Sequence, residues 1–281
     1  MSQLWRYPVK SMVGEVVDAV EFDELGVVGD RTWAARDLER GGIRGAKKIG
    51  ALMRLAARDL GSGDVEITLP DGATVTTADV DADERVSAAI GHRVRLERLR
   101  PVDDLDHYRR GAPDSDDMLA ELRGIFGREG DEPLPDLSVF PPAIAEFESP
   151  PGTYYDAFPL MVMTEAALAA LQRALPDSSV DVRRFRPSLV IDTADDGADA
   201  RTPGHPEFDW VGRRATIGSA TVEFAAPCPR CVMVTREIDA STPEDGAVLR
   251  HIVRDLDQNV GIYATVVTPG TVGLGDELIL A

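Results

Sequence analysis

The sequence contains few of the side chains that bind metals through sulfur or imidazole. Only two cysteines occur in the 281 residues, and both stand in Cys228-Pro229-Arg230-Cys231, which confines any thiolate chemistry to that segment. A structural zinc site needs four ligands, usually with a second closely spaced pair of cysteines or histidines. The histidines form no such pair: they are His92, His107, His205 and His251. These absences argue against structural zinc, and the lack of a second cysteine cluster argues against an iron–sulfur domain.

Long hydrophobic runs are also absent. No apolar run in the sequence approaches the ~18 to 20 residues that a membrane-spanning helix needs. The first eight residues contain no apolar stretch of the kind found in a signal peptide. We therefore expect a cytoplasmic protein that has reduced thiols and no membrane partner.

Lysine is scarce in a strongly acidic chain. Lysine plus arginine total 30 against 49 aspartates and glutamates, a net charge of −19, and the only lysines are Lys10, Lys47 and Lys48. Such a field repels nucleic acid and anionic membranes, so we expect neither as a general partner. The acidity is typical of adaptation to high salt or of high-GC codon usage, and the sequence leaves both open. Any anionic ligand must bind where a few cations gather. Lys47 and Lys48 either line the entrance of a site or are solvated charges on a helix, and of the two we favour the solvated charges.

Short strands dominate the hydrophobic pattern, with helices between them. Alternating residues predict strands at 16–22, 65–69 and 94–99, and the tail 263–280 is predicted as two strands joined by a Pro269-Gly270 turn. Helical spacing predicts three helices: one capped at Asp114-Ser115 and ended by Gly127, one capped by Thr164, and one over 247–256. Residues 129–151 are rich in proline and acid, which predicts an ordered loop or a linker rather than a helix or strand. The pattern indicates a β-rich α+β protein of two lobes divided near residues 100–150.

The two cysteines lie between apolar segments. Residues 215–224 resemble a strand leading into the cysteine segment, and residues 232–234 are expected to lead out as another strand. A loop cysteine held between two strands is rigid, as a metal or cofactor ligand must be. A thioredoxin-type pair normally opens a helix, and the β-branched neighbours argue against that. Two inert buried thiols remain the alternative. Arg230 favours function, because a nearby cation lowers the pKa of a thiol.

Cations stand at several turn-like positions. Lys10-Ser11 lies between Pro8 and Gly14, Arg31 follows Gly29-Asp30, and Arg186 ends a cluster of arginines before Pro187. A lysine beside a serine in such a turn can bind phosphate through its charge, its hydroxyl neighbour and backbone donors. Arginine adds a planar fork that binds phosphate with two parallel hydrogen bonds. The alternative for each of these side chains is a solvated surface charge.

Four segments in this order resemble one family. They are residues 6–12 (RYPVKSM), 26–33 (GVVGDRTW), 184–187 (RFRP) and 228–231 (CPRC), and the closing residues 270–276 are also similar. The sequence resembles the MOSC-domain proteins that carry a MOSC N-terminal β-barrel region. That family includes the mitochondrial amidoxime reducing component and the C-terminal part of molybdenum cofactor sulfurases. The resemblance implies a β-barrel-like region over 1–100, a connection with a helix and a Pro/acid-rich stretch over 101–150, and a MOSC β-barrel domain with inserted helices over 151–281.

The resemblance also implies a cofactor site. It assigns Cys231 as the catalytic thiolate ligand of molybdenum. The residues implied to bind the molybdopterin and its phosphate are Lys10, Ser11, Arg31, Asp156, Arg186 and Ser188. Ser188 replaces the asparagine that the family carries after its Arg-Pro pair. Ala157 and Phe158 replace hydroxyl residues that usually follow the aspartate, which affects the handling of substrate more than the binding of cofactor.

The implied function is molybdenum-dependent reduction of N-oxygenated small molecules by oxygen-atom transfer. Electrons would come from a separate ferredoxin-, flavoprotein- or cytochrome-type donor. One alternative is a carrier of sulfur or of molybdenum cofactor without turnover of its own. The other is a small-molecule binding module with inert thiols, in which Lys10, Arg31 and Arg186 bind some other phosphate.

Overall fold

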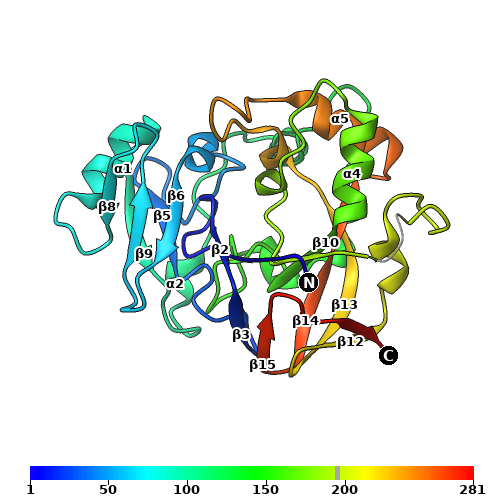
Figure 1. The fold of residues 1–281 in the computed structure, drawn as a ribbon. Helices are drawn as coiled ribbons and strands as arrows, with labels where there is room; N and C mark the ends of the chain where they lie inside the picture. The colour runs from blue at the N-terminus through cyan, green and yellow to red at the C-terminus, as the bar shows by residue number, and fades with distance from the viewer. Residues whose placement is uncertain (194–196) are drawn as a thin grey trace.

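The structure is a computed structural model that describes residues 1–193 and 197–281. It confirms a mixed α+β fold with many strands and few helices. One lobe in Figure 1 contains β5, β6, β8, β9 and α1, and the other contains the longest strands with α4 and α5. Within the described residues, none of the helices has the length and apolar character needed to cross a membrane.

The main sheet is curled and has eight strands in the order β16-β12-β13-β14-β10-β11-β1-β2. Its strands are β1 (Gln3–Arg6), β2 (Glu15–Val17), β10 (Leu160–Thr164), β11 (Leu189–Ile191), β12 (Arg214–Ile217), β13 (Ala220–Pro229), β14 (Asn259–Thr268) and β16 (Leu278–Leu280). β10 and β11 are parallel, and β1 pairs antiparallel with β11 so that Leu4 lies opposite Leu189. The beginning of the chain is thereby built into a sheet formed mostly by its second half.

Three smaller sheets have the orders β15-β3-β4, β5-β9 and β6-β7-β8. Their strands are β3 (Ala19–Asp23), β4 (Gly26–Val27), β5 (Trp33–Asp37), β6 (Ala56–Asp59), β7 (Val65–Thr68), β8 (Thr74–Thr76), β9 (Val94–Arg98) and β15 (Gly270–Gly273). The strands predicted at 65–69 and 94–99 are confirmed as β7 and β9. The strand predicted at 16–22 is divided at Asp18, because β2 and β3 enter different sheets.

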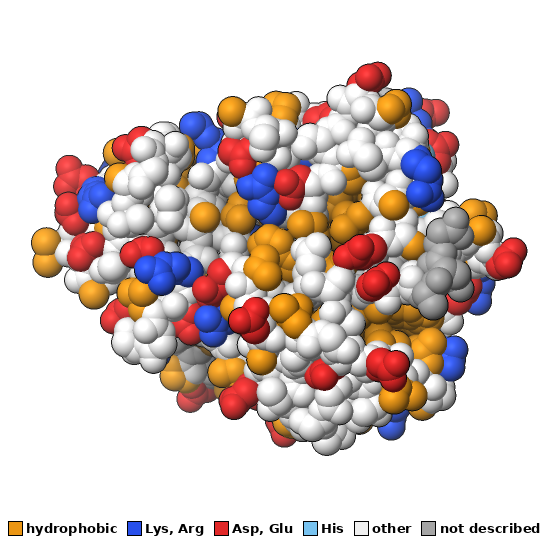
Figure 2. Space-filling model, in the orientation of Figure 1, with side chains coloured by type: hydrophobic (Ala, Val, Ile, Leu, Met, Phe, Trp, Pro, Cys, Tyr) orange, Lys and Arg blue, Asp and Glu red, His pale blue; other side chains and the backbone are white. Residues whose placement is uncertain are grey.

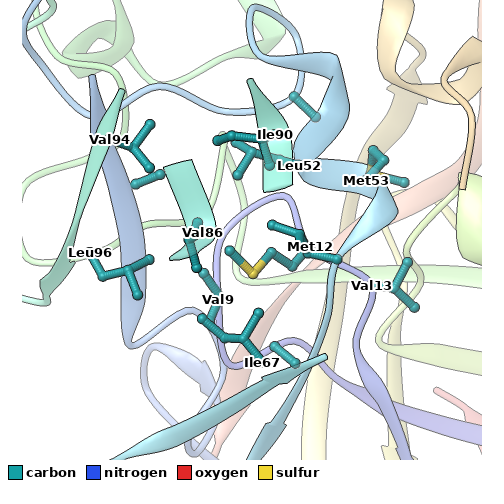
Figure 3. Packing of buried hydrophobic residues seen from close by; sticks show 14 of the residues in the cluster. Val9, Met12, Val13, Leu52, Met53, Ile67, Val86, Ile90, Val94 and Leu96 are labelled. Carbon is teal, nitrogen blue, oxygen red and sulfur yellow. The ribbon is translucent and has the colours of Figure 1, made fainter. Parts of the chain in front are cut away.

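A hydrophobic core fills the lobe of β5 to β9 (Figure 3). Val9 and Met12 are fully buried in it, on either side of Lys10-Ser11. The partly buried Cys231, from the other half of the chain, packs against the same cluster. This packing fixes the position of the Lys10-Ser11 turn relative to the cysteine segment.

The helices are short. The α-helices are α1 (Ala82–Ile90), α2 (Leu105–Tyr108), α3 (Met118–Phe126), α4 (Glu165–Ala174) and α5 (Gly246–Asp255). The 3-10 helices are η1 (Gly50–Arg54), η2 (Leu137–Val139), η3 (Pro142–Ala145), η4 (Val182–Arg184), η5 (Pro206–Trp210) and η6 (Val232–Thr235). Thr164 caps α4 as predicted, since its hydroxyl accepts a hydrogen bond from the Ala167 amide at 3.1 Å. The cap of α3 is Asp117, not Asp114 or Ser115.

Two local predictions around the cysteines are wrong. Residues 215–224 do not form one strand: β12 turns at Gly218-Ser219 and pairs with β13 as an antiparallel hairpin. Residues 232–234 do not form a strand either, because they belong to the 3-10 helix η6. β13 therefore carries the chain to Pro229, and the second cysteine stands where η6 begins.

Candidate functional site

A cavity of about 90 Å³ lies at the junction of β13 and η6 with the Lys10-Ser11 turn. Of the side chains predicted for the site, it is lined by Lys10, Ser11, Arg31, Asp156, Arg186 and Cys231. Ser188 is not part of the lining: it is buried in β10–β11 packing, where its hydroxyl oxygen lies 3.5 Å from the Met161 amide nitrogen. Residues from five separate parts of the chain, near positions 10, 31, 156, 186 and 231, thus meet at one place.

The two cysteines differ in exposure and in partners. Cys228 is buried, and its Sγ accepts a hydrogen bond from Arg230 Nη1 at 3.0 Å. Burial raises the pKa of the Cys228 thiol. Cys231 is partly exposed at the N-cap of η6. The geometry leaves Cys231 as the thiol available to a ligand in the cavity, whereas Cys228 belongs to the wall.

Asp156 is held between two lysines at the cavity. Its Oδ1 lies 2.5 Å from Lys10 Nζ, and its Oδ2 lies 2.9 Å from Lys47 Nζ. Burial opposes ionisation of Asp156, but the two ammonium groups outweigh burial and hold its pKa well below the usual range. Burial also lowers the pKa of Lys10, against the attraction of Asp156. The pKa of Lys47 is raised despite burial, by Asp156 first and by Cys231 next.

Three of the predicted cofactor residues have left-handed backbone conformations. Ser11, Arg31 and Arg186 have φ values of 67°, 50° and 57°, and the described residues include only two other non-glycine positions with positive φ, Asp257 and Gln258. Such conformations cost on the order of 1 to 3 kcal/mol each and concentrate at binding sites. Here they direct three donor side chains into one cavity.

The donor set fits an anionic cofactor that brings its own metal ligands. Arg186 Nη1 donates to the Met12 carbonyl, but the buried Nη2 finds no hydrogen-bond partner among the described residues. Burial, followed by the charge of Arg31, lowers the pKa of Arg186 to about 10. Residues 1–193 and 197–281 contain no group of three His, Cys, Asp or Glu side chains that could hold a bare metal ion. A single soft thiolate suits a metal whose other ligands come from a cofactor.

The structure adds three polar side chains to the predicted site. Lys47 contacts Asp156 at the cavity, so the interpretation of this lysine as a solvated helical charge is wrong. Arg230 and Tyr263 line the cavity beside Cys228. The position of Arg230 between two cysteines was a usable signal in the sequence. No signal in the sequence pointed to Lys47 or Tyr263, because only the tertiary fold brings these residues close to the cysteines.

Comparison with protein families matches nearly the whole chain. The MOSC N-terminal beta barrel domain matches residues 1–107, and the MOSC domain matches residues 150–279. This chain is a MOSC-domain protein. Among MOSC-domain relatives, mitochondrial amidoxime reducing component 2 of Bos taurus is 25% identical over 304 residues, covering 99% of this chain and 82% of the relative. Mitochondrial amidoxime-reducing component 1 of Homo sapiens is 25% identical, covering 100% of this chain and 82% of the relative.

Solved structures resemble the MOSC-domain chain only loosely. The YUAD protein of Bacillus subtilis is 12% identical with a TM-score of 0.43, covering 99% of this chain and 93% of that protein. YiiM from Escherichia coli is 16% identical with a TM-score of 0.32, covering 44% of this chain and 54% of YiiM. At these scores neither structure supports a statement about the site.

Proposed function

We propose that this chain binds a molybdenum–molybdopterin cofactor through Cys231 and reduces N-oxygenated small molecules. One observation carries the proposal: the accessible thiol of the cysteine pair opens into the same cavity as Lys10, Arg31 and Arg186. The names of the relatives, amidoxime reducing components, support the reaction class. A cytoplasmic location is part of the proposal, because the thiol must stay reduced to act as a ligand.

The side chains divide into two roles. Arg31, Arg186 and Ser11 would hold the phosphate of the cofactor, while Asp156 fixes Lys10 and Lys47 at its edge. The apolar part of the wall would exclude water and contact a neutral substrate: it consists of Ala157, Phe158, Met161, Phe185 and Met233. When bound, the cofactor would supply two-electron oxygen-atom transfer. Release of that oxygen as water consumes two electrons and two protons, the electrons coming from a separate ferredoxin-, flavoprotein- or cytochrome-type donor.

Molybdenum per chain, measured by elemental analysis, tests the ligand assignment. Wild type purified from a host that makes the cofactor is expected to contain near-stoichiometric metal. Cys231→Ala removes the thiol that faces the cavity and should abolish the metal. Cys228→Ala is the matched control and should keep most of it, since Cys228 is a buried wall residue. Equal loss in both variants contradicts the assignment of a single ligand.

Turnover separates the enzyme from a carrier of sulfur or cofactor. Molybdenum-loaded protein is expected to reduce benzamidoxime repeatedly with reduced methyl viologen as the electron source. Cys231→Ala prepared in the same way controls for direct reaction with the dye. Bound molybdenum without turnover would favour the carrier, and absence of molybdenum from wild type with verified cofactor supply would leave the phosphate-binding module.

A further inference from the structure

We propose that Tyr7 is a positioning residue that holds Arg31 and Arg186 side by side, so that their guanidinium groups form one site for a phosphate dianion. The inference rests on the anion-binding part of the proposed function. It requires neither the metal nor the reaction. Tyr7 is almost fully buried behind the cavity and is not one of its lining residues, so it acts through the two arginines.

Hydrogen bonds tie Tyr7 to both arginine segments. Its carbonyl oxygen accepts from the Arg31 amide at 2.7 Å, and its own amide donates to Asp30 Oδ1 at 2.5 Å. Its hydroxyl donates to the carbonyl of Pro187 at 2.9 Å, directly after Arg186. One residue therefore fixes two turns that are far apart in the sequence.

The ring of Tyr7 also contacts both cations. The Cζ atoms of Arg186 and Arg31 lie 4.2 Å and 5.4 Å from the ring centroid. A cation over an aromatic ring is stabilised by roughly 0.5 to 1 kcal/mol at exposed sites and by about 2 or more when both groups are desolvated. Tyr7 is 1% exposed, so its contact with Arg186 belongs to the desolvated kind.

The buried guanidinium of Arg186 and the partly buried one of Arg31 lie against the same ring, and two cations so placed need such support. They repel each other, which contributes to the lowered pKa of Arg186. Asp30 pairs with Arg31 and offsets one of the charges. The buried Nη2 of Arg186 still has no hydrogen-bond partner among the residues that the structure describes. An anion in the cavity would supply that partner, and the ring keeps the donor in place before the anion arrives.

The test measures binding of inorganic phosphate to the full chain, purified without cofactor, by isothermal titration calorimetry at constant ionic strength. Tyr7→Leu removes the ring and should weaken phosphate binding by at least tenfold. Tyr7→Phe keeps the ring and removes only the hydroxyl, so its affinity should stay within about threefold of wild type. Loss in both variants to the same extent would show that the ring is not the element that positions the arginines.

Tyr108→Leu is the matched control. Tyr108 is also 1% exposed, and its hydroxyl also donates to a backbone carbonyl, that of Arg100, but it packs in another cluster. The Tyr108→Leu substitution should lower the unfolding temperature, as Tyr7→Leu does, but it should leave the affinity for phosphate unchanged. Equal loss of affinity in Tyr108→Leu, unchanged affinity in Tyr7→Leu, or no phosphate binding by wild type would each overturn the inference. Molybdenum content is a separate readout, so a failure of the Cys231 assignment is distinguishable from a failure here.

Discussion

At the scale of single residues, the site is built from ordinary side chains on an uncommon backbone. Ser11, Arg31 and Arg186 all adopt the left-handed conformation that usually favours glycine. The surrounding core must supply the free energy for this, and fully buried neighbours such as Val9 and Met12 do so at the first turn. A sequence shows such a position only when it is glycine. The strain at these three residues was therefore invisible before the fold was known.

Asp156→Asn tests the electrostatic bridge between Lys10 and Lys47. The substituted amide would keep an acceptor but lose the charge, and we expect the free energy of unfolding at pH 7 to fall by about 2 kcal/mol. This loss is smaller than the roughly 3 to 5 kcal/mol that follows when one partner of a fully buried ion pair is removed. The reason is that the Asp156 side chain is 39% exposed, so solvent screens the interaction. Denaturant unfolding of both proteins as a function of pH measures the difference.

The pH dependence has a definite sign. The pKa of folded Asp156 lies below its unfolded value, so its ionisation stabilises the protein above the unfolded pKa of about 3.9. The difference between wild type and Asp156→Asn should therefore be full near neutrality and shrink as the pH falls through the acid range. Asp103→Asn, at an exposed carboxylate, is the control and should change little at any pH. A difference that stays constant down to pH 3 contradicts the bridge.

At the scale of elements, periodicity predicted the helices α4 and α5 and the strands β7 and β9, but it failed in the segments that lead into and out of the cysteine motif. α4 and α5 were predictable, because each places several apolar side chains on one face. The β12–β13 hairpin was missed, because its turn consists of only Gly218-Ser219 between two β-rich segments. η6 was missed because four residues carry no helical period. Both errors lie beside the cysteines, where local geometry matters most.

The C-terminus of α3 illustrates how a glycine permits close packing against η6 and α5. Gly127 has φ 62°, and a Cβ placed there would lie 2.8 Å from Leu249 Cδ2 and 3.2 Å from Val232 Cβ. Val232 begins η6, directly after Cys231. Gly127→Ala should lower the free energy of unfolding by about 2 to 4 kcal/mol, through left-handed strain and overpacking together. Chemical denaturation measures the change.

Gly91→Ala is the matched control for that substitution. Gly91 ends α1 with φ 67°, and a Cβ there would meet nothing within 4 Å. Only the cost of the left-handed backbone conformation remains at Gly91, so the free energy of unfolding should fall by about 1 kcal/mol. Similar losses in the two variants would mean that the close approach of Leu249 and Val232 to Gly127 adds no overpacking cost.

At the scale of the whole molecule, the charge of the site is opposite to that of the chain. The net charge is −19, and acidic side chains are spread across the face seen in Figure 2 rather than gathered in one patch. The cavity nevertheless brings together Lys10, Arg31, Arg186 and Arg230. The sequence predicted this contrast, since the acidic field required an anion to bind where cations cluster. It did not predict Lys47 as a member of the cluster, because that contact exists only after the lobes fold together.

The dispersed negative charge predicts that salt stabilises the fold. Like charges on a compact chain repel each other, and the screening length falls from about 10 Å at 0.1 M salt to about 3 Å at 1 M. The unfolding temperature should therefore rise by several degrees with added NaCl, with most of the rise complete by about 0.5 M, because screening saturates. Sucrose is the control, because it stabilises proteins by being excluded from their surface and screens no charge. With sucrose the unfolding temperature should rise steadily with concentration and should not level off. An unfolding temperature that stays flat or falls up to 0.5 M NaCl would show that self-repulsion among the acidic side chains does not limit stability.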